Sequence, residues 1–268
     1  MMTEKRKNDF SVLDRPEILQ CIFHPRPESS YSGMGTGSGE SFMIPVAEDV
    51  QIGACFHMAS PAGPNILYFH GNGEIVSDYD QFGPVYNRMG VNFIPVGYRG
   101  YGRSDGTPTV SSMMLDCHRI FEFVKKMLDE KKCTGPLFIM GRSLGSASAL
   151  ELAENFEAEI DGLIIESGFA FAKPLLRLMG VNVDGIGFME DKGFCNVDKI
   201  IGFSKPLLII HAEYDYVIPF SDGRVLFERC SSSQKKLLMI PEAGHSDIFM
   251  NGLSDYMNAV RTLVFKQV

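Results

Sequence analysis

A serine flanked by glycines is the strongest chemical signal in this chain. It lies in Gly141-Arg142-Ser143-Leu144-Gly145, directly after the apolar run 137–140 and before a segment with helical periodicity. This order predicts a sharp strand-to-helix turn, in which glycines two residues before and after Ser143 remove clashing side chains and leave the hydroxyl at the tip. A serine hydroxyl is a weak nucleophile, so it needs a base, and the base needs an orienting acid.

Both partners are available downstream of the serine. His245 lies in a loop between the last predicted strand and the last predicted helix, where the alternative role is capping that helix. Asp215 comes just past another apolar strand, where a carboxylate can accept the imidazole Nδ1–H and fix its tautomer. Glu213 and Glu166 are the alternative acids. The sequence therefore predicts a triad in the chain order Ser143, Asp215, His245.

Acyl transfer also needs hydrogen-bond donors for a developing oxyanion. We expect one donor to be the backbone N–H of Leu144, which follows the serine and begins a helix. The second donor is expected from the glycine-bracketed turn 70–73, with Asn72 as the first choice and Gly73 as the second. His70 is interpreted as a structural residue of that turn.

Other motifs argue for neither a metal nor a cofactor. The glycine-rich stretch 98–108 lacks the Gly-Lys-Ser/Thr ending of a phosphate-binding loop, so it is interpreted as a packed turn beside the site. His211 ends a predicted strand and is interpreted as a core histidine. No cluster with metal-ligand spacing stands out, so we expect no bound metal and no cofactor.

Composition narrows the remaining classes of protein. The chain has 268 residues and a formal net charge of −8, which disfavours nucleic acid or an anionic membrane as the main partner. The polar stretch 1–9 does not resemble a secretory signal, and no window approaches the ~20 apolar residues of a membrane span. Six scattered cysteines without a CxxC pair are expected to be thiols in a reducing compartment. We therefore expect a cytoplasmic protein without a stable membrane anchor.

Apolar runs of strand length alternate with amphipathic segments of helix length. Strands are predicted at 42–46, 51–57, 65–69, 91–96, 137–140, 162–165, 206–210 and 236–240, and helices at 76–89, 110–128, 144–155 and 248–265. Thr109 or Thr107 is expected to cap the helix that starts near residue 110. Strands that are apolar throughout indicate an α/β fold with a mostly parallel sheet and helices on both faces. In such sheets functional groups gather beyond the carboxyl ends of the strands, where every residue singled out above would lie.

The motifs together resemble the α/β-hydrolase superfamily over about residues 45–265. The motifs are His70-Gly71-Asn72-Gly73, Tyr98 to Ser104, Gly141 to Gly145, Asp215 to Pro219 and Gly244-His245. The nearest branch contains small serine hydrolases such as protein depalmitoylases and lysophospholipases. The resemblance implies an eight-stranded α/β-hydrolase fold, with Ser143 as nucleophile, Asp215 as acid, His245 as base, and Asn72 and Leu144 at the oxyanion hole. Ala212 stands where such chains often have glycine, which a strand end should tolerate.

The expected organisation is a lead-in at 1–40, ending in a glycine- and serine-rich loop at 32–39, and one hydrolase domain at 41–268. The superfamily usually inserts a lid where this chain has residues 167–205. This segment is rich in Phe, Met and Leu, which either pack the insertion onto the domain or line an acyl pocket. The predicted pocket residues are Phe171, Met179, Phe188 and Met189.

These observations predict a serine hydrolase of a small-molecule carboxylic ester or thioester with a small to medium acyl chain. The reaction would pass through an acyl-enzyme. A peptidase or amidase on the same scaffold is one alternative, and a non-catalytic ligand-binding protein is another.

Overall fold

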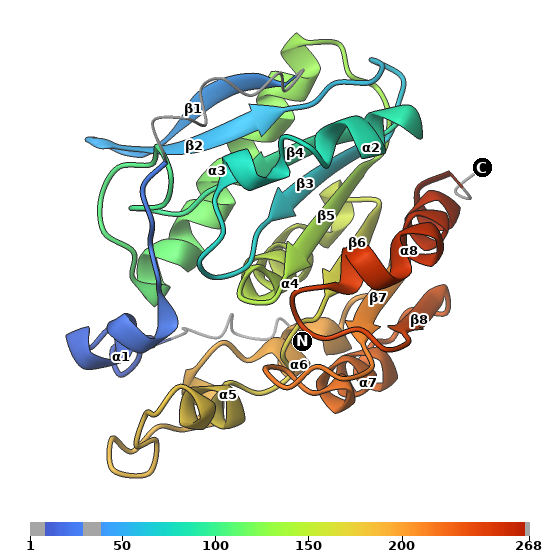
Figure 1. The fold of residues 1–268 in the computed structure, drawn as a ribbon. Coiled ribbons are helices and arrows are strands. Elements are labelled where there is room, and N and C mark those ends of the chain that lie inside the picture. Colours follow the sequence, from blue (N-terminus) through green and yellow to red (C-terminus); the bar gives the residue numbers. More distant parts are fainter. Residues whose placement is uncertain (1–8, 29–38, 266–268) are drawn as a thin grey trace, which may run out of the picture.

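Eight strands form one sheet that helices cover on both faces (Figure 1). The computed structural model describes residues 9–28 and 39–265, and nearly all of the predicted loop at 32–39 lies outside these ranges. The sheet order is β1-β2-β4-β3-β5-β6-β7-β8. The strands are β1 (Glu40–Ala47), β2 (Val50–Phe56), β3 (Asn65–Phe69), β4 (Asn92–Val96), β5 (Leu137–Arg142), β6 (Gly162–Glu166), β7 (Leu207–Ala212) and β8 (Lys235–Ile240).

Strands β3 to β8 run parallel to one another. Strands β1 and β2 form an antiparallel hairpin, and β2 pairs antiparallel with β4. All residues of β3, β4, β6 and β7 are buried. Burial on both faces explains why these strands consist almost entirely of apolar residues. The predicted mostly parallel, eight-stranded α/β fold is confirmed.

Two hydrophobic clusters lie on opposite faces of the sheet. The helices are α1 (Pro16–Ile22), α2 (Gly83–Arg88), α3 (Val110–Glu130), α4 (Gly145–Phe156), α5 (Ala172–Leu178), α6 (Asn196–Ile201), α7 (Phe220–Arg229) and α8 (Ile248–Phe265). One cluster contains the buried apolar residues of α3, α4, α6 and α7, and the other contains those of α2 and α8. Among the helices of residues 9–28 and 39–265, none has the length and apolar character that crossing a bilayer requires.

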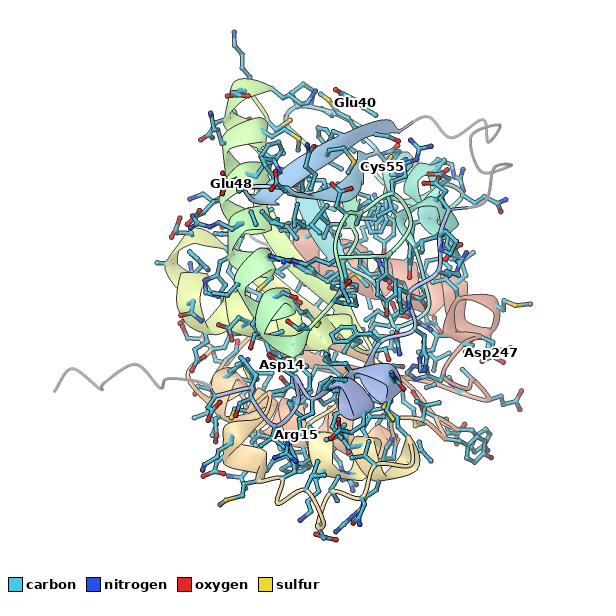
Figure 2. All side chains as sticks on the ribbon, turned by 90° about the vertical axis from the view of Figure 1, so that its left-hand side faces the viewer. Asp14, Arg15, Glu40, Glu48, Cys55 and Asp247 are labelled. Carbon is cyan, nitrogen blue, oxygen red and sulfur yellow. The ribbon has the colours of Figure 1, made fainter. Side chains whose placement is uncertain are left out.

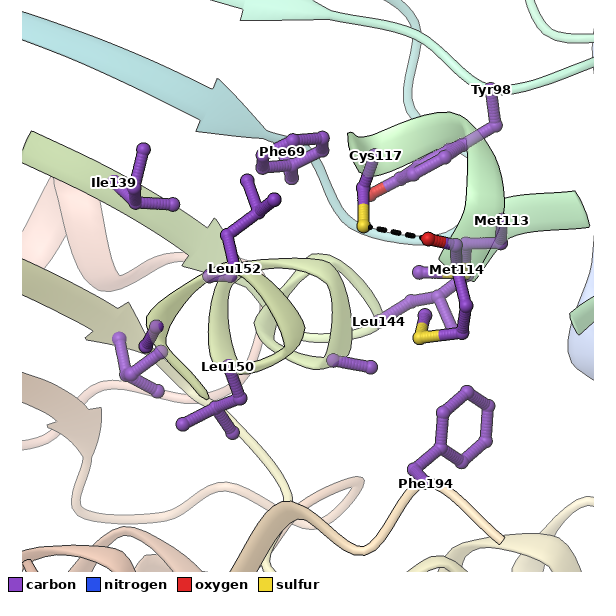
Figure 3. Close-up of a cluster of buried hydrophobic side chains, with 14 of the residues drawn as sticks. Phe69, Tyr98, Met113, Met114, Cys117, Ile139, Leu144, Leu150, Leu152 and Phe194 are labelled. Atoms are coloured by element: carbon purple, nitrogen blue, oxygen red, sulfur yellow. Dashed lines mark hydrogen bonds between the residues drawn. The ribbon is translucent and has the colours of Figure 1, made fainter. Parts of the chain in front are cut away.

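Helix α3 begins where a threonine cap was expected, and Thr109 is that cap. Its Oγ1 accepts a hydrogen bond from the Ser112 backbone N–H at 2.9 Å, and the Ser112 hydroxyl accepts one from the Thr109 N–H at 2.9 Å. This reciprocal arrangement satisfies donors that a helix start leaves free. Figure 3 shows the buried side of α3, including Met114 and Cys117, beside Leu144 at the start of α4.

The predicted helix 76–89 is in fact two short elements. A 3₁₀ helix, η2 (Val76–Tyr79), is followed by α2, which starts at Gly83 with Pro84 in its first turn. Proline suits this position because the first turn needs no N–H from it, and it does not suit the interior of a longer helix. The sequence analysis also missed α1 and α7 and the short helices α5 and α6 within 167–205.

The lead-in contributes to the core rather than only preceding it. Ile18 and Ile22 of α1, with Phe10, Leu13 and Phe23 around it, are buried in the same cluster as α3 and α4. In Figure 1 the arrowheads of the central strands point toward the end of the molecule where α1 and α5 lie. The lead-in therefore packs at the end of the sheet where the functional residues were predicted.

Candidate active site

Ser143 occupies the strained turn that the sequence predicted between β5 and α4. Its φ of 51° lies in the left-handed region, which is uncommon for a residue other than glycine. A Cβ on Gly141 would come within 2.3 Å of the Gly145 carbonyl oxygen, and one on Gly145 within 2.2 Å of the Phe69 carbonyl oxygen. Both glycines are therefore required by close backbone contacts.

The structure brings the three predicted triad residues together. His245 Nε2 lies 3.0 Å from Ser143 Oγ, and His245 Nδ1 lies 2.7 Å from Asp215 Oδ2. The ionised carboxylate only accepts hydrogen bonds, so Nδ1 carries the proton and Nε2 presents its lone pair to the serine hydroxyl. A continuous hydrogen-bonded chain thus runs from acid to base to alcohol.

Asp215 is held in place by its own loop after β7. Its Oδ1 accepts the backbone N–H groups of Val217 and Ile218 at 3.0 and 2.8 Å, which leaves Oδ2 for the imidazole. Burial alone would raise the pKa of Asp215, but the hydrogen bond and charge of His245 and the N–H of Ile218 hold that pKa below its ordinary value. His211 is fully buried beneath this loop, where its Nε2 lies 2.8 Å from the Ile218 carbonyl oxygen.

The two alternative acids have other partners. Glu213 accepts the backbone N–H of Glu242 through Oε2 at 3.0 Å. Glu166 pairs with Arg142, whose Nε donates to Oε1 at 3.0 Å, and its Oε2 accepts the Tyr256 hydroxyl at 2.7 Å. Of the three carboxylates, the structure therefore places Asp215 on the imidazole.

Arg142, the residue before the serine, connects three segments around the site. Its Nη2 donates to the carbonyl oxygen of His245 at 2.7 Å, while Nη1 and Nε pair with Glu74 and Glu166. Glu74 Oε2 in turn accepts the backbone N–H of Gly71 at 2.6 Å. One guanidinium thus links the serine turn, the histidine loop and the loop after β3.

Burial alone would lower the pKa of Arg142, but the carboxylates of Glu74 and Glu166 outweigh burial and raise it above its ordinary value. The arginine is therefore a permanent cation. A cavity of about 250 Å³ reaches this group, with Arg142 and Ser246 in its lining beside aromatic side chains such as Tyr256 and Phe249. The second position of the serine motif, which Arg142 occupies, is not defined by the motif, so the sequence analysis missed this role.

The loop after β3 lies beside the lead-in. Asn72 Oδ1 accepts the backbone N–H of His24 at 2.9 Å and the Tyr101 hydroxyl at 2.6 Å, and Asn72 Nδ2 lies 2.8 Å from His24 Nδ1. Arg26 Nε donates to the Gly73 carbonyl oxygen at 2.8 Å. These bonds fix the loop from which the second oxyanion donor was predicted. Those from His24 and Arg26 come from the segment that the sequence analysis treated as a lead-in.

His70 is fully buried below the same loop, and the predicted packed turn borders it. The His70 ring contacts the Tyr98 ring at a centroid distance of 4.6 Å, and the Tyr98 hydroxyl donates to the His70 carbonyl oxygen at 2.7 Å. Burial is the largest effect on the pKa of His70 and lowers it, so the ring is neutral. Both features fit the structural role expected for His70.

The four predicted pocket residues lie in different environments. Phe171 and Met189 are exposed and Met179 is half-buried, so all three are accessible to a ligand. Phe188 is buried in the hydrophobic core, where it packs residues 167–205 onto the domain. Lys199 of α6 attaches the same segment to α4 through a buried ion pair with Glu151 at 2.7 Å.

Comparisons with known proteins agree with this architecture. Residues 61–182 match the sequence model of a family described as serine aminopeptidase, S33. The chain is 29% identical over 254 residues to human alpha/beta hydrolase domain-containing protein 17B, covering 91% of this chain and 81% of that protein. It is 33% identical over 245 residues to the lysophosphatidylserine lipase ABHD12 of Xenopus tropicalis, covering 81% of this chain and 61% of the lipase.

The fold also matches a solved esterase. Est1E from Butyrivibrio proteoclasticus, in its structure with ferulic acid, superimposes with a TM-score of 0.69 at 18% identity, covering 84% of this chain and 98% of Est1E. A match at this identity establishes the fold alone. The chain belongs to the α/β-hydrolase superfamily. The relatives of the chain include a lipase and its structural neighbours include esterases, and its superfamily membership indicates a hydrolase.

Proposed function

We propose that this protein is a serine hydrolase that cleaves carboxylic esters or thioesters through an acyl-enzyme. The observation that carries the proposal is the continuous chain from Asp215 Oδ2 through His245 to Ser143 Oγ, with separations of 2.7 and 3.0 Å. Both distances are within the reach needed for proton transfer between a nucleophile and its base.

In the first half of the reaction, Ser143 Oγ attacks the carbonyl carbon of the substrate while His245 Nε2 accepts its proton. Asp215 stabilises the resulting imidazolium, and the imidazolium then gives the proton to the leaving alcohol or thiol. In the second half, water repeats these steps on the acyl-enzyme and releases the carboxylic acid. Arg142 holds the carbonyl oxygen of His245 and so positions the base.

The negative charge on the carbonyl oxygen is assigned to the backbone N–H of Leu144 and to that of Asn72, with Gly73 as the alternative donor. Leu144 is the N-cap residue of α4, so its N–H lies at the positive end of a helix of 12 residues. The hydrogen bonds from His24 and Arg26 keep the Asn72–Gly73 backbone in a fixed position before substrate binds. A preorganised donor avoids reorganisation during the reaction.

A relative described as a lipase and structural neighbours described as esterases favour an ester substrate, with residues 167–205 covering the acyl group. Phe171, Met179 and Met189 are accessible apolar side chains of this segment and are proposed to contact the acyl chain. The match to a model described as serine aminopeptidase favours amide cleavage as the second candidate function.

A chain-length series of p-nitrophenyl esters and acyl-CoA thioesters tests the proposal, with aminoacyl p-nitroanilides measured in parallel. We expect ester or thioester turnover with a preference for small to medium acyl chains, and a loss of about 10⁴- to 10⁶-fold in Ser143→Ala. Met189→Ala should shift the chain-length preference, whereas Met250→Ala, another exposed methionine, should not. Turnover in Ser143→Ala close to that of the wild type would overturn the assignment, and turnover of anilides alone would favour the amidase.

A further inference from the structure

Three side chains with metal-binding chemistry meet at the β1–β2 end of the sheet. Cys55 and His57 are two residues apart along β2 and its extension, so their side chains point to the same face. Asp80 follows η2 and approaches them from the neighbouring loop. One ligand atom from each residue lies within 4.8 Å of the others. Figure 2 places Cys55 at this end of the molecule, apart from Asp247 in the loop after β8.

The imidazole of His57 is fully buried, and neither ring nitrogen has a hydrogen-bond partner among the described residues. A Cβ on Gly83 would come within 2.2 Å of the ring, and one on Gly39 within 2.7 Å, so the two glycines form a slot that fits the ring. His57 Nε2 points toward Asp80 Oδ1 at 4.0 Å. A buried polar group without a hydrogen-bond partner is destabilising, so this arrangement favours a bound ligand.

A cation bound between these three side chains would offset the effect of burial on their charged forms. Burial lowers the pKa of His57, so its imidazole is neutral and offers a lone pair. Burial and the nearby Glu28 carboxylate raise the pKa of Asp80, although Arg103 opposes them. Burial, with the charge of Asp80 as a further cause, raises the pKa of the Cys55 thiol to about 11. Each group would gain from a positive ion placed between them.

We propose that Cys55, His57 and Asp80 bind a divalent transition-metal ion with the preferences of zinc. Thiolate, imidazole and carboxylate are the three ligand types that zinc takes in proteins. A thiolate and a carboxylate together balance the charge of the ion, and the thiol proton leaves to solvent as the metal–sulfur bond forms.

The geometry allows this coordination with a small movement. Tetrahedral zinc with bonds of about 2.0–2.3 Å needs its ligand atoms about 3.5 Å apart, so the cluster closes by about 1 Å. The Asp80 side chain is 30% exposed and can rotate inward. A cavity of about 290 Å³ has Cys55 and Asp80 in its lining and gives the ion and a fourth ligand, water, a way in.

Such an ion would join β2 to the end of η2. The segment from Gly71 to Asp80 contains both the loop assigned to the oxyanion and η2, so the bound ion would stabilise this side of the molecule. Since none of its three ligands belongs to the Ser143 site, metal binding here can be tested separately from the proposed hydrolase activity.

Cobalt(II) titration of the metal-stripped full-length protein, with the thiols kept reduced, tests the site. We expect one equivalent to produce a near-ultraviolet thiolate-to-cobalt charge-transfer band and the visible bands of tetrahedral cobalt, both removed by an equivalent of zinc. Zinc should also raise the melting temperature. Cys55→Ser should lose the charge-transfer band, whereas Cys133→Ser, which replaces another buried thiol, should keep it.

Asp80→Asn tests the site without touching the core. It should weaken zinc binding at least tenfold, while Asp255→Asn on the exposed side of α8 should leave binding unchanged. Absence of a thiolate band in the wild type would overturn the proposal, as would a band that persists in Cys55→Ser. If Cys55→Ser fails to fold, an unchanged zinc affinity in Asp80→Asn would be equally decisive against it.

Discussion

Replacing Asp215 by asparagine tests the orientation of the base with almost no change in shape. In the wild type Oδ1 accepts two backbone N–H groups and Oδ2 accepts the His245 Nδ1–H. Asparagine must keep its oxygen on the backbone donors, so its NH₂ group would face Nδ1. The imidazole would then present a lone pair at Nδ1 and carry its proton on Nε2, 3.0 Å from Ser143 Oγ, where it can no longer accept the serine proton.

This change of tautomer should lower kcat by about 10⁴-fold, which corresponds to about 5.5 kcal/mol of activation free energy. The assay is steady-state hydrolysis of the best p-nitrophenyl ester, with circular dichroism to verify the fold. Asp222→Asn is the matched control, because this partly buried carboxylate accepts the Ala170 N–H at 2.8 Å and does not touch His245. Activity in Asp215→Asn within tenfold of the wild type, or an equal loss in Asp222→Asn, would refute the reasoning.

Two further predictions concern buried ion pairs. Arg142→Ala should lower kcat about 10- to 100-fold with little change in KM, because the His245 carbonyl oxygen loses its hydrogen-bond donor. Added guanidinium can enter through the adjoining cavity and should restore part of the rate. The control is Arg99→Lys, at an arginine that pairs with Asp116, which should not lower kcat. An unchanged kcat in Arg142→Ala would contradict the positioning role of Arg142. Glu151→Gln should lower the free energy of unfolding by about 3 kcal/mol at pH 7, because Lys199 is left buried without its partner. Burial opposes ionisation of Glu151, yet hydrogen bonds and cationic neighbours lower its pKa to about 2 in the folded protein. The ionised carboxylate therefore contributes its full stabilisation above the pKa of about 4.3 that glutamate has in the unfolded chain. This stabilisation is lost as the pH falls toward 2. Urea titrations measure the difference in free energy of unfolding between wild type and Glu151→Gln. Below about pH 4.5 this difference should decrease by about 1.4 kcal/mol per pH unit, and a difference that does not change with pH would be inconsistent with this pKa.

The sequence contained enough local information to predict the sheet and the positions around Ser143. The glycine-bracketed turn is encoded within five residues, and the apolar strands before Asp215 and His245 determine where these side chains emerge. Because parallel strands end at a common edge, the three residues could be expected to meet. The close backbone contacts of Gly141 and Gly145 supply the physical reason for the motif.

Contacts between distant segments could not be predicted in the same way. Nothing in the local sequence indicates that His24 bonds to Asn72, 48 residues away, or that Arg142 reaches the His245 carbonyl. The proximity of Asp80 to Cys55 and His57 could not be predicted for the same reason, since Cys55 and His57 alone are an ordinary pair of residues on a strand. The helix predicted at 76–89 was wrong in extent because apolar periodicity continued past Gly83 and Pro84.

The central claim is that Ser143 is an activated nucleophile. Its most direct test is reaction of the purified protein with a fluorophosphonate, followed by mass spectrometry of the labelled peptide. The account predicts one phosphonyl group per chain, located on Ser143, with labelling slowed by several orders of magnitude in His245→Ala. Absence of labelling would favour a non-catalytic ligand-binding protein, and a label on another residue would contradict the assigned site.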